Sequence, residues 1–339
     1  MKIVAVRQDS NGDVLLAGPA LRALAAQATE LTLVCGPAGR AAAETLPGVD
    51  RVICAEASWI AANPAVPRRG DVDDYVDRIA ALHADRAFVF TSFHQSPLPA
   101  ALLLRMAGVP WVGAISEDYP GALLDLRHRG VPDDVHEVER ALALVRAGGF
   151  ELVPGDDGRL AMRVAQRNPL EPLVGPYVVV HPGATVPARA WSPEKNRALV
   201  RTLAARGERV VVTGGADERD LCASVAGREA LDLSGATSFE ELARVVADAR
   251  AIVVGNTGAA HVAAAVGTPT VSLFPPTIPA SRFRPWMVEH VLLGDQDIAC
   301  RGCRARVCPR GDHACVECVG VDDVLCALDA LRARTAVPA

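Results

Sequence analysis

The chain has 339 residues, of which 50% are hydrophobic, and its formal net charge is -5. At ~100–200 residues per domain, this length predicts two domains. The acidic balance argues against a nucleic-acid binder, which needs a basic face. No apolar run approaches the ~20 residues of a transmembrane helix, and residues 1–7 lack the regions of a signal peptide. We therefore expect a soluble cytoplasmic protein with at most peripheral membrane contact and no nucleic-acid partner.

In the first half of the chain, short β-branched runs alternate with longer helical patterns. Strands are predicted at Ile3–Val6, Leu31–Cys35, Arg51–Cys54 and Ala87–Phe90. Helices are predicted at Val14–Ala26, with a kink at Pro19, and at Ala38–Leu46, Asp73–Leu82 and Pro99–Met106. Such alternation predicts parallel βαβ units with right-handed crossovers.

A stretch rich in proline and glycine, residues 153–176 with Pro172 among them, interrupts this alternation as a linker would. Strands are then predicted at Tyr177–Val180, Arg209–Thr213, Ala251–Val254 and Thr270–Phe274, the last clear strand. Helices are predicted at Pro193–Arg206, Glu218–Val225, Phe239–Asp248, Ala259–Val266 and Val321–Arg334. Each half is therefore expected to form an open α/β sheet.

Ligands of open α/β sheets bind beyond the carboxyl ends of the strands. Four segments occupy such positions: Gln8–Asp13, His181–Trp191, Gly214–Glu218 and Gly255–His261. In the first of them, Gly12 permits a tight strand-to-helix turn, and Asp13 lies at or near the helix start. Asp13 has two interpretations, a helix N-cap or a general base at the mouth of a cleft.

The segments of the second half have the composition of anion-binding turns. Gly183, Ala184 and Thr185 follow a strand, and a glycine there lets backbone N–H groups approach an anion. Arg189 could bind diphosphate oxygens bidentately, or it could be an ordinary surface arginine. Glu218 could accept a ribose hydroxyl or simply favour the dipole of its helix.

The segment from Gly255 to His261 is a further strand–turn–helix junction. Thr257 offers a hydroxyl, Gly258 an accessible N–H group, and His261 a possible donor to a phosphate. The chain has no P-loop, and no G-x-G-x-x-G follows its first strand, which argues against NTPase and simple dehydrogenase functions.

Two motifs suggest a metal, and for each we favour a structural interpretation. The acidic run Asp71–Asp74 has the D-x-D pattern, but it precedes a predicted helix and is interpreted as capping and solvation. Five cysteines lie close together in the sequence, and their two C-x-x-C pairs would suit zinc: Cys300, Cys303, Cys308, Cys315 and Cys318. Reduced structural thiols are typical of the cytosol, so we predict no metal.

Together these segments resemble glycosyltransferase family 9, the heptosyltransferase family of the GT-B fold. The resemblance rests on short motifs spread over nearly the whole chain: Ser10-Asn11-Gly12-Asp13-Val14, Pro19-Ala20-Leu21, His181-Pro182-Gly183-Ala184, Arg189-Ala190-Trp191, Gly255-Asn256-Thr257-Gly258-Ala259-Ala260-His261 and Gly267-Thr268-Pro269. Cys303, Cys308-Pro309, Gly311, His313 and Cys315 also resemble the family's C-terminal signature.

The resemblance implies an inverting transfer from a nucleotide-diphosphate sugar, typically ADP-heptose, without a cofactor. Asp13 matches the family's catalytic aspartate, and Arg189 falls where the family usually has a lysine facing the leaving diphosphate. Contacts to the donor phosphates and sugar are implied for Gly183, Ala184, Thr185, Thr257, Gly258 and His261, and contacts near the ribose and adenine for Glu218 and Thr237. Asn256 stands where the family commonly has an aspartate that contacts the donor sugar.

The resemblance also implies an α/β architecture of two Rossmann-like, doubly wound domains facing a central cleft. We expect an acceptor-binding domain over residues 1–165, a nucleotide-sugar-binding domain over 176–322, and a closing helix and tail over 323–339. The acceptor would be a glycan, a lipid-linked glycan or a small molecule. Two alternatives stay open: a nucleotide-sugar epimerase or hydrolase of the same fold, and a zinc-stabilised protein that binds without catalysis.

Overall fold

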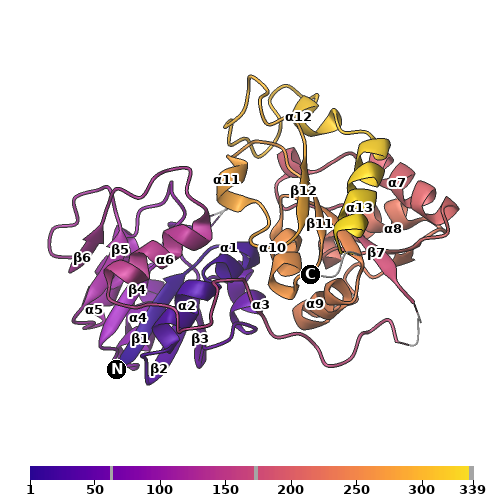
Figure 1. The fold of residues 1–339 in the computed structure, drawn as a ribbon. Coiled ribbons are helices and arrows are strands. Elements are labelled where there is room, and N and C mark those ends of the chain that lie inside the picture. Colours follow the sequence, from indigo (N-terminus) through magenta and orange to yellow (C-terminus); the bar gives the residue numbers. More distant parts are fainter. Residues whose placement is uncertain (62–63, 172–174, 336–339) are drawn as a thin grey trace. The chain divides into compact units, whose positions relative to one another are not determined.

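Residues 1–61, 64–171 and 175–335 are described by the computed structural model of this chain, which divides into two units, residues 1–162 and 163–339 (Figure 1). Pro172 of the predicted linker and residues 336–339 of the predicted tail lie outside the described residues. Each unit contains one parallel sheet of six strands with helices on both faces. The prediction of two doubly wound α/β units is therefore confirmed.

The sheet of the first unit has the strand order β3-β2-β1-β4-β5-β6, and all its pairings are parallel. In the register, Val4 of β1 lies between Thr32 of β2 and Ala87 of β4. The strands are β1 (Lys2–Arg7), β2 (Glu30–Cys35), β3 (Arg51–Cys54), β4 (Arg86–Val89), β5 (Val112–Ile115) and β6 (Leu126–His128).

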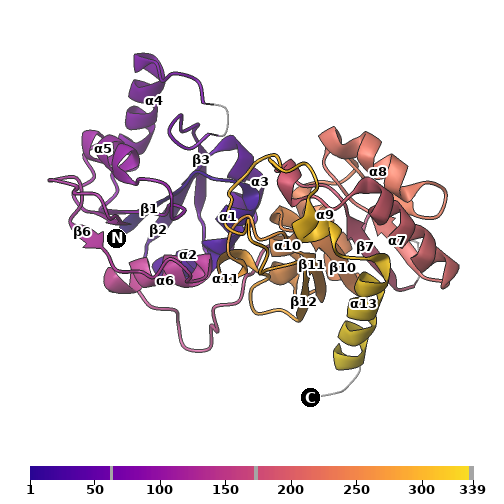
Figure 2. The same ribbon diagram turned by 90° about the horizontal axis from the view of Figure 1, so that it is seen from above.

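Two helices, α4 (Arg69–Ala80) and α5 (Leu98–Met106), cover one face of this sheet, where Ile79 and Leu104 join a buried cluster with Val4. Figure 2 shows α2 (Gly18–Ala25) and α6 (Glu137–Ala147) on the opposite face. The remaining helical segments of the unit are α1 (Asn11–Leu16), η1 (Pro37–Gly39) and α3 (Arg40–Ala43). The inner strands β1, β2, β4 and β5 are buried on both faces, as in other sheets that helices cover on two sides.

The sheet of the second unit has the strand order β12-β11-β10-β7-β8-β9, again all parallel. Its strands are β7 (Tyr177–His181), β8 (Arg209–Val212), β9 (Leu231–Asp232), β10 (Ala251–Gly255), β11 (Thr270–Leu273) and β12 (His290–Leu293). The strand order reverses between β7 and β10, as it does between β1 and β4 in the first unit. Such switch points are where open α/β sheets bind ligands.

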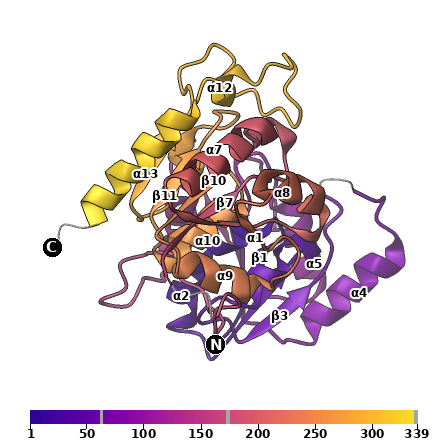
Figure 3. The same cartoon turned by 90° about the vertical axis from the view of Figure 1, so that its right-hand side faces the viewer.

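Three helices, α7 (Pro193–Ala205), α8 (Arg219–Ala226) and α13 (Val321–Thr335), lie on one face of this sheet, and α9 (Phe239–Ala247) and α10 (Gly258–Val266) lie on the other (Figure 3). On the first face, Leu199, Val225 and Leu328 share one core with Val180. The short segments are η2 (Pro187–Arg189), η3 (Ala216–Glu218), α11 (Ala280–Phe283) and α12 (Ala314–Glu317).

Several predicted elements differ from the observed ones. The single helix predicted at Val14–Ala26 is two helices, α1 and α2, with the break at Ala17. Pro19 sits in the first turn of α2, where its missing N–H group costs nothing, so it marks a helix start rather than a kink. Thr270–Phe274 is not the last strand, because β12 follows it.

No helix among the described residues has the length and apolar character needed to cross a membrane.

Candidate active site

Asp13 lies in the first turn of α1, immediately beyond the carboxyl end of β1. Its Oδ1 accepts a hydrogen bond from Arg7 Nη2 (3.0 Å), and its Oδ2 accepts one from Ser10 Oγ (2.8 Å). Ser10 occupies the N-cap position, so the interpretation of Asp13 as the helix cap is wrong. The carboxylate is held through both oxygens, yet its side chain is 20% exposed.

Arg7 is the centre of the charged groups around Asp13. Its side chain is only 4% exposed, and its guanidinium also lies 3.2 Å from Asp9 Oδ2 and 3.9 Å from Glu137 Oε2. A further hydrogen bond runs from Arg7 Nη2 to Ser92 Oγ (3.0 Å). Burial by itself lowers the pKa of Arg7, but Asp9, Asp13 and Glu137 together raise it above its ordinary value.

The strand order explains why these residues meet. Arg7 is the last residue of β1 and Ser92 follows β4, and these two strands are neighbours at the switch point of the first sheet. Glu137 is the first residue of α6, which packs against α1. Sequence analysis did not select Arg7, Asp9 or Glu137; the available signal was an arginine at the end of an apolar strand, two residues before an aspartate.

In the second unit, the turns after β7, β8 and β10 lie at one edge of the sheet, because these strands are neighbours and parallel. The structure thereby brings together the segments after these three strands, which hold Gly183, Glu218 and Asn256. Thr237 lies in the loop between β9 and α9, and β9 is the neighbour of β8. The candidate donor residues thus share one end of one sheet.

Glu218 connects the turns after β7 and β8. Its Oε2 accepts a hydrogen bond from the Gly215 N–H group (2.8 Å), and its carboxylate lies so close to Gly183 that a Cβ at that position would collide with it. Burial lowers the pKa of His181, against a smaller opposing effect of Glu218. His181 Nδ1 is 3.0 Å from Thr213 Oγ1, so the imidazole is tied to the end of β8.

Arg189 ends η2, the short segment between β7 and α7. The backbone here packs tightly, because a Cβ on Gly255 would lie 3.1 Å from the Arg189 carbonyl oxygen. The neighbouring Ala188 N–H group donates to the Arg306 carbonyl (3.0 Å). Arg189 is thus placed beside the end of β10, while Thr185, earlier in the same loop, is exposed and Ala184 is half-buried.

The junction between β10 and α10 presents unsatisfied donors. Thr257 occupies the N-cap position of α10 without a side-chain capping bond, and Gly258 is the first helical residue. N–H groups in the first turn of a helix have no acceptor within the helix, and they favour an anion. Asn256 is 4% exposed, and its Nδ2 has no hydrogen-bond partner among the described residues. His261 is buried in the first turn of the same helix.

The motifs considered for metal binding have other surroundings. Asp71 and Asp73 lie within α4, which begins at Arg69, so the prediction of a capping loop before the helix is wrong. Exposed arginines pair with these acids instead: Arg68 with Asp71 at 3.1 Å, and Arg69 with Asp73 at 3.5 Å.

The cysteines near the C-terminus are all free thiols. Burial, followed by the neighbouring thiols of Cys300, Cys308 and Cys303, raises the pKa of Cys315 to about 11. Among the described residues, no three His, Cys, Asp or Glu side chains are arranged to hold a metal ion.

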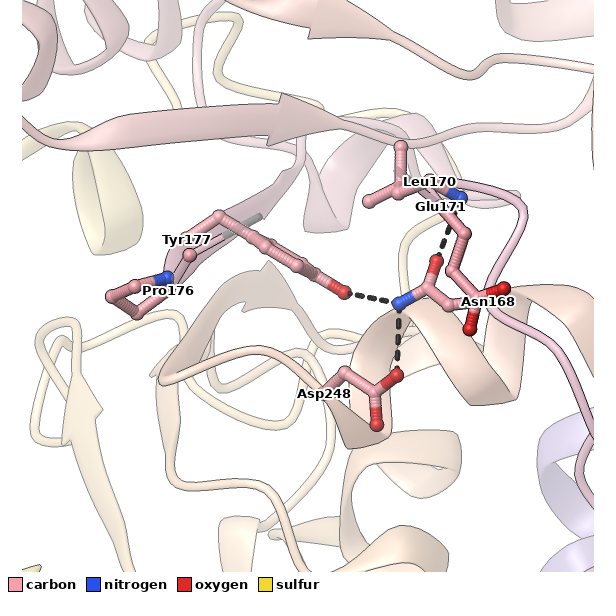
Figure 4. A pocket seen from close by; sticks show the side chains of 7 residues that line it. Asn168, Leu170, Glu171, Pro176, Tyr177 and Asp248 are labelled. Atoms are coloured by element: carbon pink, nitrogen blue, oxygen red, sulfur yellow. Dashed lines mark hydrogen bonds between the residues drawn. The ribbon is translucent and has the colours of Figure 1, made fainter. Parts of the chain in front are cut away.

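A pocket of about 270 Å³ lies at the start of β7, the opposite end from the turns after β7, β8 and β10 (Figure 4). Figure 4 shows Asn168 pointing toward Tyr177 and Asp248, and its Nδ2 is 3.0 Å from the Tyr177 hydroxyl and 2.9 Å from Asp248 Oδ2. The Tyr177 hydroxyl donates in turn to the Val245 carbonyl (2.7 Å). These groups satisfy one another, and none of them belongs to the candidate site.

The fold and these turns define a class: two doubly wound α/β units, one with a carboxylate fixed by hydrogen bonds after its first strand and the other with glycine-containing turns at the carboxyl ends of its central strands. The model of glycosyltransferase family 9 (heptosyltransferase) matches residues 85–313. The chain therefore belongs to this family.

Curated relatives and a solved structure agree with this assignment. Lipopolysaccharide heptosyltransferase 1 of Pseudomonas aeruginosa is 32% identical over 227 residues, which cover 63% of this chain and 61% of that protein. Lipopolysaccharide heptosyltransferase 3 of Escherichia coli is 35% identical over 116 residues, which cover 32% of this chain and 34% of that protein. In both cases the alignment spans less than two thirds of the relative.

The structure of E. coli ADP-heptose LPS heptosyltransferase II has a TM-score of 0.75 with this chain, at 21% identity, and the match covers 99% of this chain and 100% of that one. At this identity the likeness establishes the fold: the α/β architecture is that of a GT-B heptosyltransferase.

Proposed function

We propose that the chain is an inverting glycosyltransferase that transfers a sugar, with a heptose from ADP-heptose as the first candidate, to an acceptor hydroxyl. The observation that carries the proposal is the Asp13 carboxylate, which is held through both oxygens at a switch point and is still partly exposed. Family membership and relatives named as lipopolysaccharide heptosyltransferases support the choice of donor.

In the proposed reaction, Asp13 takes the proton of the acceptor hydroxyl as its oxygen attacks the anomeric carbon of the donor. The new bond joins the acceptor oxygen to this carbon. The bond between the carbon and the diphosphate oxygen breaks, and the nucleoside diphosphate leaves with the electron pair. Attack from the face opposite the leaving group inverts the configuration.

The departing diphosphate gains negative charge, and the second unit offers groups that favour it. Arg189 supplies a fixed positive charge, and the first turn of α10 supplies N–H dipoles together with His261. The backbone at Gly183–Thr185 adds further donors beside the end of β7. Preorganised donors of this kind stabilise charge that develops in a transition state.

The nucleoside and the sugar would be recognised by the remaining residues of the same edge. We assign the ribose hydroxyls to Glu218, the adenine to the segment of Thr237, and the donor sugar to Asn256. Within the described part of the chain, the Nδ2 group of Asn256 has no hydrogen-bond partner, and a sugar hydroxyl would satisfy it. An amide both donates and accepts, whereas an ionised carboxylate only accepts.

The test combines a donor screen with a transfer assay. ADP-, UDP- and GDP-sugars are ranked by calorimetry, and transfer is then measured from ADP-heptose to a lipopolysaccharide core acceptor. Asp13→Asn should lower kcat by about 10²–10⁴-fold, the usual contribution of a general base, while the Kd for ADP stays unchanged. Asp74→Asn, on the exposed surface of α4, is the matched control.

Each other outcome of this test has a definite meaning. Full turnover in Asp13→Asn would remove Asp13 from the role of base. Release of ADP without any acceptor product would favour a nucleotide-sugar hydrolase, and a changed sugar still attached to the nucleotide would favour an epimerase. Stoichiometric zinc without affinity for any of the nucleotide sugars would favour the binding protein.

A further inference from the structure

The charged groups around Asp13 are more numerous than a single base requires. Three carboxylates, those of Asp9, Asp13 and Glu137, approach one buried guanidinium, that of Arg7. Arg140, on α6, is the second guanidinium close enough to influence this group. When all five groups are ionised, the cluster carries one negative charge more than it carries positive charges.

Arg7 contacts the two aspartates at the same time. Its Nη2 donates to Asp13 Oδ1 (3.0 Å), and its Nε lies 3.2 Å from Asp9 Oδ2. The other oxygen of Asp9 accepts a hydrogen bond from Gln95 Nε2 (2.6 Å), and the Asp9 side chain is only 10% exposed. Asp9 is therefore fixed in place beside the guanidinium that holds Asp13.

These two neighbours act on Asp13 in opposite directions. A guanidinium at hydrogen-bonding distance favours the ionised carboxylate and so weakens it as a base. A nearby carboxylate disfavours a second negative charge and so strengthens Asp13 as a base. Burial is the main cause that raises the pKa of Asp9 itself, with Arg7 opposing it and Asp13 adding to it.

We propose that Arg7 and Asp9 are positioning residues for Asp13: Arg7 orients its carboxylate, and Asp9 offsets the Arg7 charge so that Asp13 keeps the basicity of a general base. The proposal rests on the proposed function, in which Asp13 takes the proton of the acceptor. A lone Arg7–Asp13 pair would leave the base ionised but too weak, and a lone aspartate would be free to rotate.

The charged side chains of α2 and α3 pair with other residues. On the helices packed against α1, Arg22 of α2 lies 2.6 Å from Asp156, and Arg40 of α3 lies 2.7 Å from Glu44. The charges that face this cluster are those of Asp9, Glu137 and Arg140, together with Arg7 itself. His94 interacts with Asp9, and Asp133 and Glu117 interact with Arg140. Arg7 and Asp9 are the pair whose removal should move Asp13 in opposite directions.

The experiment measures the titration of Asp13 without any substrate. In protein labelled with aspartate carrying ¹³C in the side-chain carboxyl group, the Asp13 resonance is assigned by its loss in Asp13→Asn. We expect the Asp13 pKa to fall in Asp9→Asn, where the guanidinium loses one of the two other carboxylates that offset it, and to rise in Arg7→Gln. A charge at this range shifts a carboxyl pKa by about one to three units, and Asp74→Asn should leave it unchanged.

A further variant, Arg7→Lys, tests the proposal when Arg7→Gln cannot be used. If Arg7→Gln does not fold, as judged by circular dichroism, Arg7→Lys retains the charge and should keep the Asp13 pKa near the wild-type value while lowering kcat through lost orientation. Shifts of Asp9→Asn and Arg7→Gln in the same direction, or no shift beyond that of Asp74→Asn, would overturn the proposal.

Kinetics then separates this proposal from the proposed function. With ADP-heptose and a lipopolysaccharide core acceptor, the acid limb of kcat/KM should move to lower pH in Asp9→Asn and to higher pH in Arg7→Gln, with the Kd for ADP unchanged. If Asp13→Asn keeps full turnover, the base role fails even where the resonances shift. If Asp13→Asn is inactive and the resonances do not shift, only the positioning roles fail.

Discussion

The turn after β1 and the turn after β7 stand at equivalent places in two sheets of the same topology, yet they offer different chemistry. After β1, the functional groups are side chains: the guanidinium of Arg7 and the carboxylates of Asp9 and Asp13. After β7, Gly183 has no side chain, and the carboxylate of Glu218 fills the space beside it. One topology therefore supports both a cluster of charged side chains and a turn that has no side chain at Gly183.

The difference follows from what each partner demands under the proposed function. A proton acceptor needs a carboxylate whose basicity and orientation are controlled, which takes several charged neighbours at fixed distances. A diphosphate is large and already charged, and it is best received by N–H groups at strand and helix ends. Variants that remove these features test whether the turn after β1 depends on charged side chains and the turns of the second unit depend on backbone N–H groups.

The largest effect in the second unit is expected from Arg189→Ala. Under the proposed function, this change removes a charge-assisted contact to the diphosphate, which is worth about 1.5–3 kcal/mol, so the Kd for ADP should rise by roughly 10- to 100-fold in calorimetry. Arg201→Ala, an exposed arginine of α7, is the matched control. An unchanged Kd would mean that the second unit binds ADP without the Arg189 side chain. Its turns would then differ even more from the turn after β1, where the functional groups are charged side chains.

A smaller effect is expected from Gly183→Ala, which puts a Cβ where the Glu218 carboxylate lies. Because the carboxylate must move, we expect ADP to bind about tenfold more weakly and the protein to lose about 1 kcal/mol of unfolding free energy, at the low end of the cost of overpacking. Calorimetry and urea unfolding test both values. Gly70→Ala, where the new Cβ meets no other part of the structure within 4 Å, should leave ADP binding unchanged and should not destabilise the protein, because alanine is favoured over glycine in α4. Wild-type binding by Gly183→Ala would show that this turn needs no bare backbone.

The smallest effect is expected from Glu317→Gln. Glu317 accepts hydrogen bonds from the Ser192 N–H group (2.8 Å) and from Ser192 Oγ (3.1 Å), and it lies 3.2 Å from Lys195 Nζ. These contacts hold α12 to the start of α7, just after the loop from His181 to Trp191. The neutral amide should cost about 0.5–1 kcal/mol in urea unfolding, because the ion pair is partly exposed, and the Kd for ADP should not change.

Glu194→Gln, an exposed position in the first turn of α7, is the control for this last variant and should fall within a few tenths of a kcal/mol of wild type. A loss of ADP affinity in Glu317→Gln would show that ADP binding depends on a charged side chain outside the turn after β7. The turn after β1 likewise depends on the charged side chains around Asp13. The turns after β1 and β7 would then differ less than we propose.

Much of the fold could be predicted because the strands are apolar and the turns carry characteristic residues. Val178–Val180 and Val210–Val212 are β-branched runs, and they are buried strands. Prediction also left out β5, β6 and α6, which lie between α5 and the predicted linker, and the missed strands are all short. β9 has two residues, and the half-buried β12 is an edge strand that follows an irregular segment.

The helix boundary at Ala17 illustrates a second limit. Hydrophobic periodicity continues from Val14 to Leu24, so the pattern by itself favours one helix. Gly18 and Pro19 interrupt it, and the structure shows a new helix beginning there. Local backbone chemistry decided a boundary that periodicity could not.

The amino-acid order was enough to determine which turns hold the glycines, the histidine and Asp13, because these residues follow directly on apolar strands. Only the tertiary structure revealed the neighbours of Asp13. Arg7, Ser92 and Glu137 are separated by 85 and 45 positions along the chain, and the pairing of β1 with β4 and the packing of α6 on α1 bring them together. Parallel sheets join strands that are distant in sequence, so the residues around Asp13 include Arg7 and Asp9 but do not show that Ser92 and Glu137 also meet there.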